Sequence, residues 1–193
     1  YETGKHKQIG VMDLGGGSLE LAVASDMQIT WSTSLPIGSG WLHDRYLFDD
    51  PPTLHEITAA EAFLQTYFQN VPIPLRIPTL IVTGGSANSL FRLAQEAFHQ
   101  PPKPRRLTRE DLTRCRDLLS VLKSTDIATL YKQSLARTRI LLAGTLIIMH
   151  IMQQCQLQEI QVNPHGIREG VLLAYARYGE NWLIEAGKAA SLQ

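Results

Sequence analysis

One segment near the beginning of the chain combines acidic residues with consecutive glycines. Residues 13–20 read Asp-Leu-Gly-Gly-Gly-Ser-Leu-Glu and follow directly on an apolar run. Glycine lets the backbone adopt φ > 0 and come close to a ligand, and the N–H groups of such a loop can converge on a phosphate. The predicted phosphate-binding residues are Gly15, Gly16, Gly17 and Ser18. The alternative is a plain β-hairpin, although hairpin turns seldom need three glycines between an acid and a serine.

Carboxylates flank this loop on both sides. Asp13 stands at the carboxyl end of the preceding apolar run, where it can hold Mg²⁺, directly or through water, beside a bound phosphate. Glu20 lies on the strand that follows the loop, where it can hold the same ion or orient a water molecule. We therefore predict catalytic and metal-binding roles for both residues.

A second glycine loop, Thr-Gly-Gly-Ser-Ala at residues 83–87, also ends a β-branched run and opens a helix. Helix N-termini with small residues accept phosphate through exposed N–H groups and the helix dipole. We predict that Gly84, Gly85 and Ser86 line the same ligand site, with simple tight packing as the alternative. Ligands of open α/β sheets bind at the carboxyl ends of strands, so each loop strengthens the interpretation of the other.

Other charged residues carry weaker signals. Arg137 and Arg139 could contact phosphate, because the guanidinium fork suits bidentate phosphate binding, and a solvated helix face is the alternative. The basic cluster of Lys103, Arg105 and Arg106 could steer a polyanion, but its flanking prolines favour a solvated loop.

Two adjacent pairs receive structural interpretations. Arg168-Glu169 is interpreted as an ion pair at a helix start. His43-Asp44 could suggest a metal or catalytic site, but no partner ligands accompany it. Neither pair is therefore assigned to the site.

Hydrophobic periodicity predicts the elements that position these residues. Strands are expected over residues 9–13, 19–24, 27–35, 79–83 and 159–163. Helices are expected over residues 53–68, 86–98, 108–122, 134–154 and 166–178, with another starting at about 126. The order β-β-β-α-β-α-β-α predicts a mixed α/β sheet covered on both faces. A helical insert over about 108–131 lies outside that alternation, and the proline-rich segment 100–106 is expected to be a linker or exposed loop.

Composition limits the class of protein. The chain has 193 residues, of which 44% are apolar and 19% charged, as in a globular domain. Lysine plus arginine equals aspartate plus glutamate at 18 each, which argues against DNA binding and requires a local cluster to hold any polyanion. The longest apolar run, residues 140–152, is too short and too interrupted to cross a bilayer. With only Cys115 and Cys155 we expect no disulfide framework and a cytoplasmic location.

In order and spacing, the chain resembles the exopolyphosphatase/guanosine pentaphosphatase (Ppx/GppA) family of the actin-like ATPase superfamily. Residues 13–20 resemble the family's Asp-Ile-Gly-Gly-Gly-Ser-Thr-Glu block. The other matching segments are residues 35–38 (Leu-Pro-Leu-Gly in the family), 83–86 (Gly-Gly-Thr, with serine replacing threonine), Arg137 (the head of an arginine-led helix) and 166–172 (Gly-Leu-Arg-Glu-Gly). The likeness covers about residues 9–178, and the element order is also that of the superfamily's ribonuclease H-like lobe.

The resemblance implies an activity. Family members are similar in having two ribonuclease H-like lobes with the active site between them. They release the terminal phosphate of polyphosphate, or the 5′-γ-phosphate of guanosine pentaphosphate, with Mg²⁺ and an activated water. Carried over by position, the loop glycines, Ser18, Ser86 and Arg137 would bind phosphate, while Asp13 and Glu20 would position Mg²⁺ and the water.

The resemblance also implies that part of the site lies elsewhere. The family's first phosphate loop and its catalytic glutamate belong to the preceding lobe, and only twelve residues come before Asp13. We therefore expect residues 9–178 to be the second lobe and residues 179–193 a C-terminal tail. The N-terminal lobe is then absent from this chain, which alone should hydrolyse little or nothing.

Two other functions stay open. The chain could be a non-catalytic sensor of guanosine tetraphosphate or polyphosphate, or the ATP-binding half of a sugar kinase-like ATPase, although bulky Asn88 and Leu90 suit adenine less well. The expected partners are polyphosphate or guanosine pentaphosphate and the missing lobe, with no DNA and no membrane. An exposed inter-lobe face could also support a homodimer.

Overall fold

The computed structural model describes residues 8–25, 28–74, 77–99, 101–182 and 184, without the side chains of Ile167 and Arg168. The expected strand start at Met27 lies outside the described residues, and so do residues 183 and 185–193 of the tail expected over residues 179–193. The strands are β1 (Gln8–Leu14), β2 (Leu19–Ser25), β3 (Gln28–Leu35), β4 (Leu80–Thr83), β5 (Arg106–Thr108) and β6 (Glu159–Val162). The first helices are α1 (Ser39–Tyr46), α2 (Leu54–Gln69), α3 (Gly85–Phe98) and α4 (Arg109–Val121). The rest are α5 (Ser124–Leu130), α6 (Leu135–Arg139), α7 (Leu141–Gln154), α8 (Ile167–Tyr178) and a short 3₁₀ helix (Gly179–Asn181).

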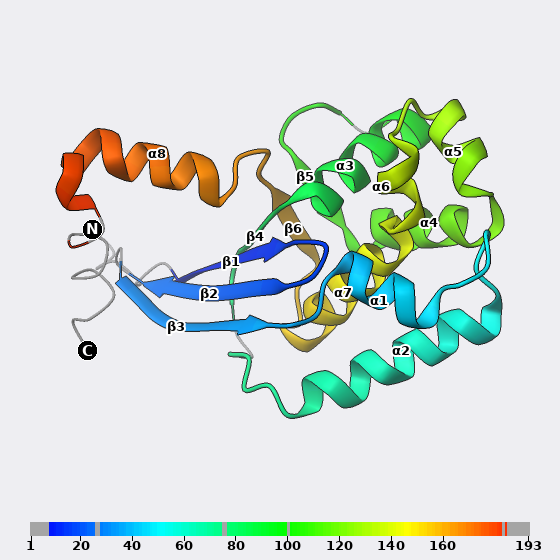
Figure 1. Cartoon of the computed structure of the whole chain (residues 1–193), viewed down its shortest axis with the longest axis horizontal. Helices are drawn as coiled ribbons and strands as arrows, with labels where there is room; N and C mark the ends of the chain where they lie inside the picture. The colour runs from blue at the N-terminus through cyan, green and yellow to red at the C-terminus, as the bar shows by residue number, and fades with distance from the viewer. Residues whose placement is uncertain (1–7, 26–27, 75–76, 100, 183, 185–193) are drawn as a thin grey trace.

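The strands form a six-stranded mixed sheet in the order β3-β2-β1-β4-β6-β5. The first three strands are the predicted antiparallel meander, and β4 and β6 run parallel to β1. The carboxyl ends of β1, β4 and β6 therefore lie at the same end of the sheet, and Figure 1 shows the meander of β1 to β3 leading into α1. Both glycine loops begin at this end of the sheet.

One strand lies at the end of a segment expected to be a loop. Residues 100–106 were interpreted as a linker or exposed loop, but Arg106 begins β5, which pairs antiparallel with β6. Leu107 is fully buried and anchors this short edge strand. A strand of three residues leaves little periodicity to detect, so tertiary pairing determines it.

The core lies between one face of the sheet and the helices. Met12, Leu14 and Leu21 on the first two strands are nearly inaccessible. Every residue of α7 from Leu141 to Ile148 is buried, and this helix packs against α1, α2, α3 and α4. Because α7 is apolar on all sides, it can only be a central helix.

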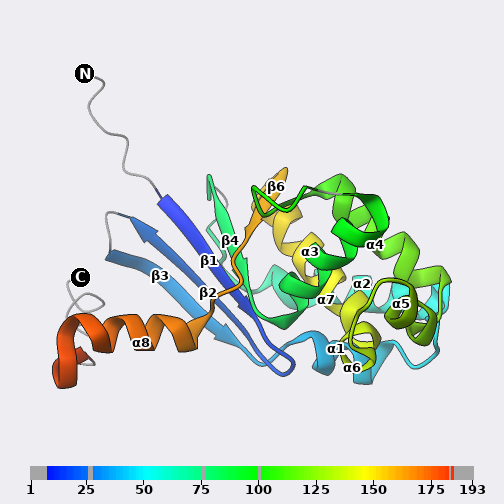
Figure 2. The same ribbon diagram turned by 90° about the horizontal axis from the view of Figure 1, so that it is seen from above.

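The opposite face of the sheet is not covered by a helix within the described residues, so the expectation of two covered faces is wrong. Ile9 and Val11 on this face are 37% and 40% exposed. Figure 2 shows α1–α7 on one side of the sheet and α8 extending away on the other. Leu172 and Leu173 of α8 are 68% and 72% exposed, so the last helix is not part of the core. Among the described residues no surface covers these leucines.

Two helices begin where their capping residues predict. Thr53 with Glu56 and Thr108 with Asp111 form capping boxes at the starts of α2 and α4. The predicted insert is also present as α4 and α5. No helix in the described part of the chain is long and apolar enough to cross a membrane.

Two helical features differ from expectation. Helix α1 was not predicted, because its eight residues have no strong cap or apolar stripe. The helix expected over residues 134–154 is divided at Ile140 into α6 and α7. Helix α6 packs against α3 and α5, whereas α7 runs through the core, so tertiary contacts turn the chain there.

Candidate functional site

The first glycine loop, residues 15–18, is the turn between β1 and β2. Asp13 pairs with Glu20, and Leu14 with Leu19, immediately before it. The N–H of Gly15 donates to the carbonyl of Ser18 (3.0 Å), so that amide is used inside the turn. None of the three glycines has positive φ, which corrects the expected reason for their presence. A methyl group on Gly16 or Gly17 would meet nothing within 4 Å, so these glycines leave open space above the backbone.

Two backbone N–H groups of α1 hold this loop by binding the carbonyl groups of the loop. The N–H of Ser39 donates to the carbonyl of Gly15 (3.0 Å), and that of Trp41 to the carbonyl of Gly16 (2.9 Å). A side chain on Gly38 would come within 2.5 Å of the Gly16 carbonyl, so the helix can approach only because residue 38 is glycine. The N–H groups of Gly16 and Gly17 have no acceptor within the described residues. The loop is a hairpin turn whose carbonyls are anchored and whose central amides are free to bind an anion.

The two predicted carboxylates lie side by side on β1 and β2. Burial, and then the negative charge of Glu20, raise the pKa of Asp13 above its ordinary value of 3.8. The Ser34 hydroxyl on β3 donates to Glu20 Oε1 (3.1 Å) and orients that carboxylate. Two neighbouring carboxylates that repel each other form a site that a divalent cation would stabilise.

The second glycine loop is held much more tightly. Gly84 has φ of 98°, and a side chain there would collide with the carbonyl of Leu14. Its own carbonyl accepts from the backbone N–H and the side-chain amide of Asn88 (3.2 and 3.0 Å). Arg105 donates to the Oδ1 atom of Asn88 (2.7 Å) and lies over the Phe91 ring. The Gly84 backbone is therefore held against β1, beside Asp13.

A contact between small residues joins α1, which holds the first loop, to the start of α3. The hydroxyls of Ser39 and Ser86 are 2.7 Å apart, and both residues are buried. A side chain on Gly144 of α7 would lie 2.8 Å from the Ser39 Oγ and the Ser86 Cβ, so glycine lets α1 and α3 meet there. The Ser86 side chain was predicted to line the ligand site. Instead it faces the core and positions α3.

Of the two arginines on α6, Arg137 lies against the second glycine loop. A side chain on Gly85 would collide with the Arg137 guanidinium, which therefore lies directly against the N-terminus of α3. The guanidinium adds positive charge where the first-turn N–H groups of α3 also lack intrahelical acceptors. Arg139, two residues later, lines a different cavity together with His43.

A groove of about 720 Å³ runs from the carboxylate pair across the open face of the sheet. Asp13, Glu20 and Thr83 line it, and so do Asn163, His165 and Gly166 after β6. The hydroxyl of Thr83 donates to the carbonyl of His165 (2.9 Å), which ties this third loop to the site. Asn163 and His165 are not among the predicted site residues, although Asn163 ends the strand expected over residues 159–163 and His165 comes two residues later, where ligands of α/β sheets are bound.

Other candidates are not part of the site. Arg106 pairs with Glu159 (2.8 Å), and Arg105 is bound to Asn88, so the basic cluster is not an unpaired patch. Glu169 accepts from the N–H of Gly166 (2.8 Å) at the start of α8, whereas the Arg168 side chain lies outside the described residues. No three His, Cys, Asp or Glu side chains gather as a metal site in the part of the chain that the structure describes. Burial raises the pKa of Cys115 to about 12 and that of Cys155 to about 11, so neither thiol is a nucleophile at neutral pH.

Comparison with known sequences gives a consistent result. The model of the Ppx/GppA phosphatase family matches residues 1–178. The chain is 28% identical over 168 residues to "Exopolyphosphatase 1" of Mycobacterium leprae, covering 84% of this chain and 50% of that protein. It is 27% identical over 178 residues to "Exopolyphosphatase 2" of Mycobacterium tuberculosis, covering 86% and 55%. The chain thus spans about half the length of the curated relatives it matches.

Comparison with solved structures confirms the predicted α/β fold. A structure titled as a study of the Aquifex aeolicus PPX-GPPA enzyme superposes with a TM-score of 0.75 at 25% identity, covering 88% of this chain and 57% of that one. A crystal structure of the Aquifex aeolicus family member gives a TM-score of 0.78 at 24% identity, covering 91% and 58%. In each case the matched region is again little more than half of the larger protein.

Proposed function

The chain belongs to the Ppx/GppA phosphatase family, and from this premise we propose that it is the second lobe of a phosphoanhydride hydrolase. The substrate would be inorganic polyphosphate or guanosine pentaphosphate, from which the terminal phosphate or the 5′-γ-phosphate is released. The observation that carries the proposal is the pair of unused amides, those of Gly16 and Gly17, beside the carboxylates of Asp13 and Glu20. Phosphoryl transfer depends on this combination of anion donors and charge neutralisation.

In this proposal, some of the described residues bind the phosphate and others orient the attacking water. The amides of Gly16 and Gly17, the Ser18 hydroxyl and the Arg137 guanidinium would bind the non-bridging oxygens of the terminal phosphate. Asp13 and Glu20 would orient the attacking water. The oxygen of the water forms the new bond to the terminal phosphorus while the bond from that phosphorus to the bridging oxygen breaks. The terminal phosphate is released, and the shortened chain leaves with the bridging oxygen on its new end. The proton of the water would pass to a glutamate of the first lobe, which the family resemblance implies.

Mg²⁺ fits the residues present. Magnesium is usually held by one or two carboxylates together with substrate phosphates, and Asp13 and Glu20 are paired across β1 and β2 and line the same groove. When bound by Asp13 and Glu20, it would neutralise charge on the transferring phosphate.

The exposed face of the sheet is an argument for a second lobe that covers it. The groove that contains Asp13 and Glu20 opens on this face, which exposes Val11. Since the matched region is only about half of each relative, we propose that another lobe closes over the groove and supplies the rest of the site. Alone, the chain should bind phosphate chains but hydrolyse them little.

The test measures phosphate release by the complete protein that carries this chain, with tripolyphosphate and with guanosine pentaphosphate, each with and without Mg²⁺. Gly16→Val and Asp13→Ala should each reduce Mg²⁺-dependent release by about 100-fold. The matched controls are Ala62→Val on the exposed side of α2 and Asp117→Ala on α4, which should leave release unchanged. Turnover that survives both site variants would exclude this active site. Binding without any release would instead identify a sensor module.

A further inference from the structure

Helix α8 is not used by the proposed hydrolysis and has little to pack against. Apart from the 3₁₀ helix that follows it, α8 makes no extensive contact with any strand or helix in the part of the chain that the structure describes. Figure 2 shows it leaving the sheet on the side opposite to α1–α7. Its 12 residues are too few for a helix that is stable alone in water. The helix therefore needs a surface that stabilises it.

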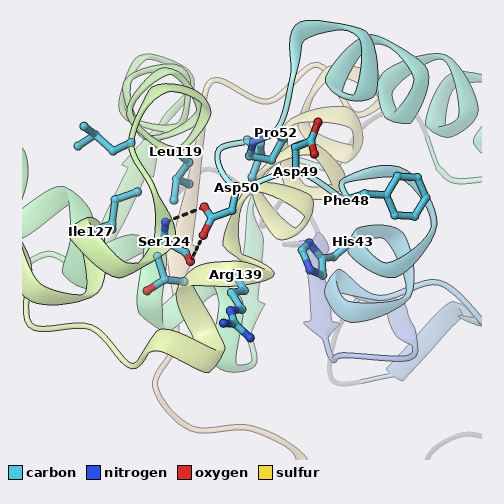
Figure 3. Close-up of a pocket in the computed structure, with 12 residues that line it drawn as sticks. His43, Phe48, Asp49, Asp50, Pro52, Leu119, Ser124, Ile127 and Arg139 are labelled. Atoms are coloured by element: carbon cyan, nitrogen blue, oxygen red, sulfur yellow. Dashed lines mark hydrogen bonds between the residues drawn. The ribbon is translucent and has the colours of Figure 1, made fainter.

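The helices at the other end of the molecule find such surfaces within the chain. Figure 3 shows a cavity of about 300 Å³ there, with Leu119 of α4 and Ile127 of α5 in its wall. Both side chains are buried. Asp50, from the connection between α1 and α2, accepts hydrogen bonds from the N–H and the hydroxyl of Ser124 at the start of α5 (2.8 and 2.5 Å). Helices α4 and α5 are thus held by contacts that α8 lacks among the described residues.

The exposed side chains of α8 are apolar on more than one side of the helix. Leu172 and Leu173 are the most exposed of them, and Tyr175 and Tyr178 are 51% and 42% exposed. With 3.6 residues per turn, Tyr175 and Tyr178 share one side of the helix, and Leu173 lies on another. A helix that is apolar on several sides is normally buried. The composition of α8 therefore suits an enclosed helix and not one that faces water.

The few charges of α8 indicate the kind of partner. Between residues 169 and 178 only Glu169 and Arg177 are charged, and Glu169 accepts from the N–H of Gly166 (2.8 Å) at the helix start. A helix that lies on an anionic membrane is instead rich in lysine and arginine on its polar face, and a nucleic-acid site also requires clustered positive charge. The partner that matches α8 is an apolar protein surface.

The comparisons indicate which protein supplies that surface. The family model matches residues 1–178, so all of α8 lies within the matched region. That region corresponds to only about half of each curated relative. An element that belongs to the family's shared region, but has no partner in this half of it, is expected to pack against the other half.

The start of α8 is fixed beside the carboxylates of the site. The Thr83 hydroxyl donates to the carbonyl of His165 (2.9 Å), which lies two residues before the helix. A side chain on Gly166, the N-cap, would lie 3.2 Å from the Thr83 Oγ1 and 3.8 Å from the Asp13 Oδ2. Helix α8 therefore leads directly from the wall of the groove to the surface that encloses it.

We propose that α8 is the helix by which this chain docks onto the other lobe of the complete protein. Leu172, Leu173, Tyr175 and Tyr178 are buried in an apolar surface of that lobe. The inference rests on the proposed function, in which another lobe closes over the groove, and it adds a second contact outside the groove. Because α8 begins beside Asp13, the lobe that holds this helix is anchored next to the carboxylates.

The test measures hydrogen–deuterium exchange of the α8 backbone amides in the complete protein and in this chain alone. Exchange in the complete protein should be about 100-fold slower, because only there is the helix packed. Leu172→Glu should reduce that protection by about 10-fold, since it places a charge in the contact, and should leave the exchange of α7 unchanged. Glutamate and leucine have similar helix propensities, so the substitution tests packing and not helix formation. The matched control is Leu130→Glu at the end of α5, a leucine that is 62% exposed, which should leave the exchange of α8 unchanged.

Three results would overturn the proposal. The first is equal exchange of α8 in the complete protein and in the chain alone. The second is slow exchange that disappears on dilution, which would show that α8 packs against a second copy. The third is the same α8 exchange in the two leucine variants. No readout involves hydrolysis, so a complete protein that releases phosphate while α8 exchanges rapidly would refute this inference and leave the proposed function standing.

Discussion

The two glycine loops end neighbouring strands, yet they use glycine for opposite purposes. At Gly16 and Gly17 an added methyl group would meet open space, so the small residues keep a surface clear above free amides. At Gly84 and Gly85 it would collide with the Leu14 carbonyl and the Arg137 guanidinium, so the small residues permit close packing. One loop is therefore built for access and the other for support. The same Gly-Gly dipeptide does not have the same meaning in both.

The sharpest test of this difference compares Gly84→Ala with Gly16→Ala. Gly84→Ala should lower the free energy of unfolding by about 3 kcal/mol, because it combines positive φ with a backbone collision. Gly16→Ala should change it by no more than about 0.5 kcal/mol. Urea unfolding of the chain, followed by circular dichroism, measures both. Similar effects of the two substitutions would remove the distinction.

A somewhat smaller loss of stability is expected at Gly144, where α7 packs against Ser39 and Ser86. Gly144→Ala should cost about 2 kcal/mol, because the methyl group would press on Ser39 and Ser86. The control is Gly170→Ala in α8, also a helical glycine, where a methyl group would meet nothing. That change should be neutral or stabilise the chain by up to about 1 kcal/mol. Thermal unfolding of both variants gives the comparison, and equal losses would show that the contact is not tight.

Ligand affinity should also divide between the arginines of α6. Arg137→Gln should weaken tripolyphosphate binding by about 10-fold, because it removes a charge at the N-terminus of α3. Arg139→Gln should leave that affinity unchanged, since its side chain lines the other cavity. Titration calorimetry with Mg²⁺ present measures both values. A loss of affinity in the Arg139 variant alone would reverse the assignment.

The smallest effect concerns the pH dependence of stability. Since the folded-state pKa of Asp13 is raised above 3.8, its ionisation opposes folding. The native chain should lose stability as the pH rises from 3.8 through the raised pKa, and Asp13→Asn should remove this loss. The variant should thus be more stable at pH 7 and equally stable below pH 3.8, as measured by unfolding at several pH values. Equal stability of the two proteins at pH 7 would show that the ionisation of Asp13 does not oppose folding.

Features that depend on neighbouring residues could be predicted from the sequence. Thr53 and Thr108 mark the starts of α2 and α4, because a capping box requires only residues within one helical turn. The meander of β1 to β3 and the strand β4 followed from short apolar runs and glycines. The candidate site could be located as two loops at strand ends for the same reason.

Features that depend on contacts between distant residues could not be predicted from the sequence. Nothing in the local pattern indicates that Ser86 bonds to Ser39, or that β5 pairs with β6. The roles of Asn163 and His165 were missed because the groove they line forms only when β6 lies beside β4.

The sequence by itself determined most of the elements, the family resemblance and the glycine loops at the strand ends, because periodicity, capping and motif spacing are properties of short segments. It did not indicate α1 or β5. The tertiary structure decided which glycines are open and which are packed, that Ser86 packs against Ser39 and Arg137 lies against Gly85, and that no helix of the described residues covers one face of the sheet. Its contacts join residues far apart in the chain, and whether a small residue serves a ligand or a neighbour depends on what lies across from it.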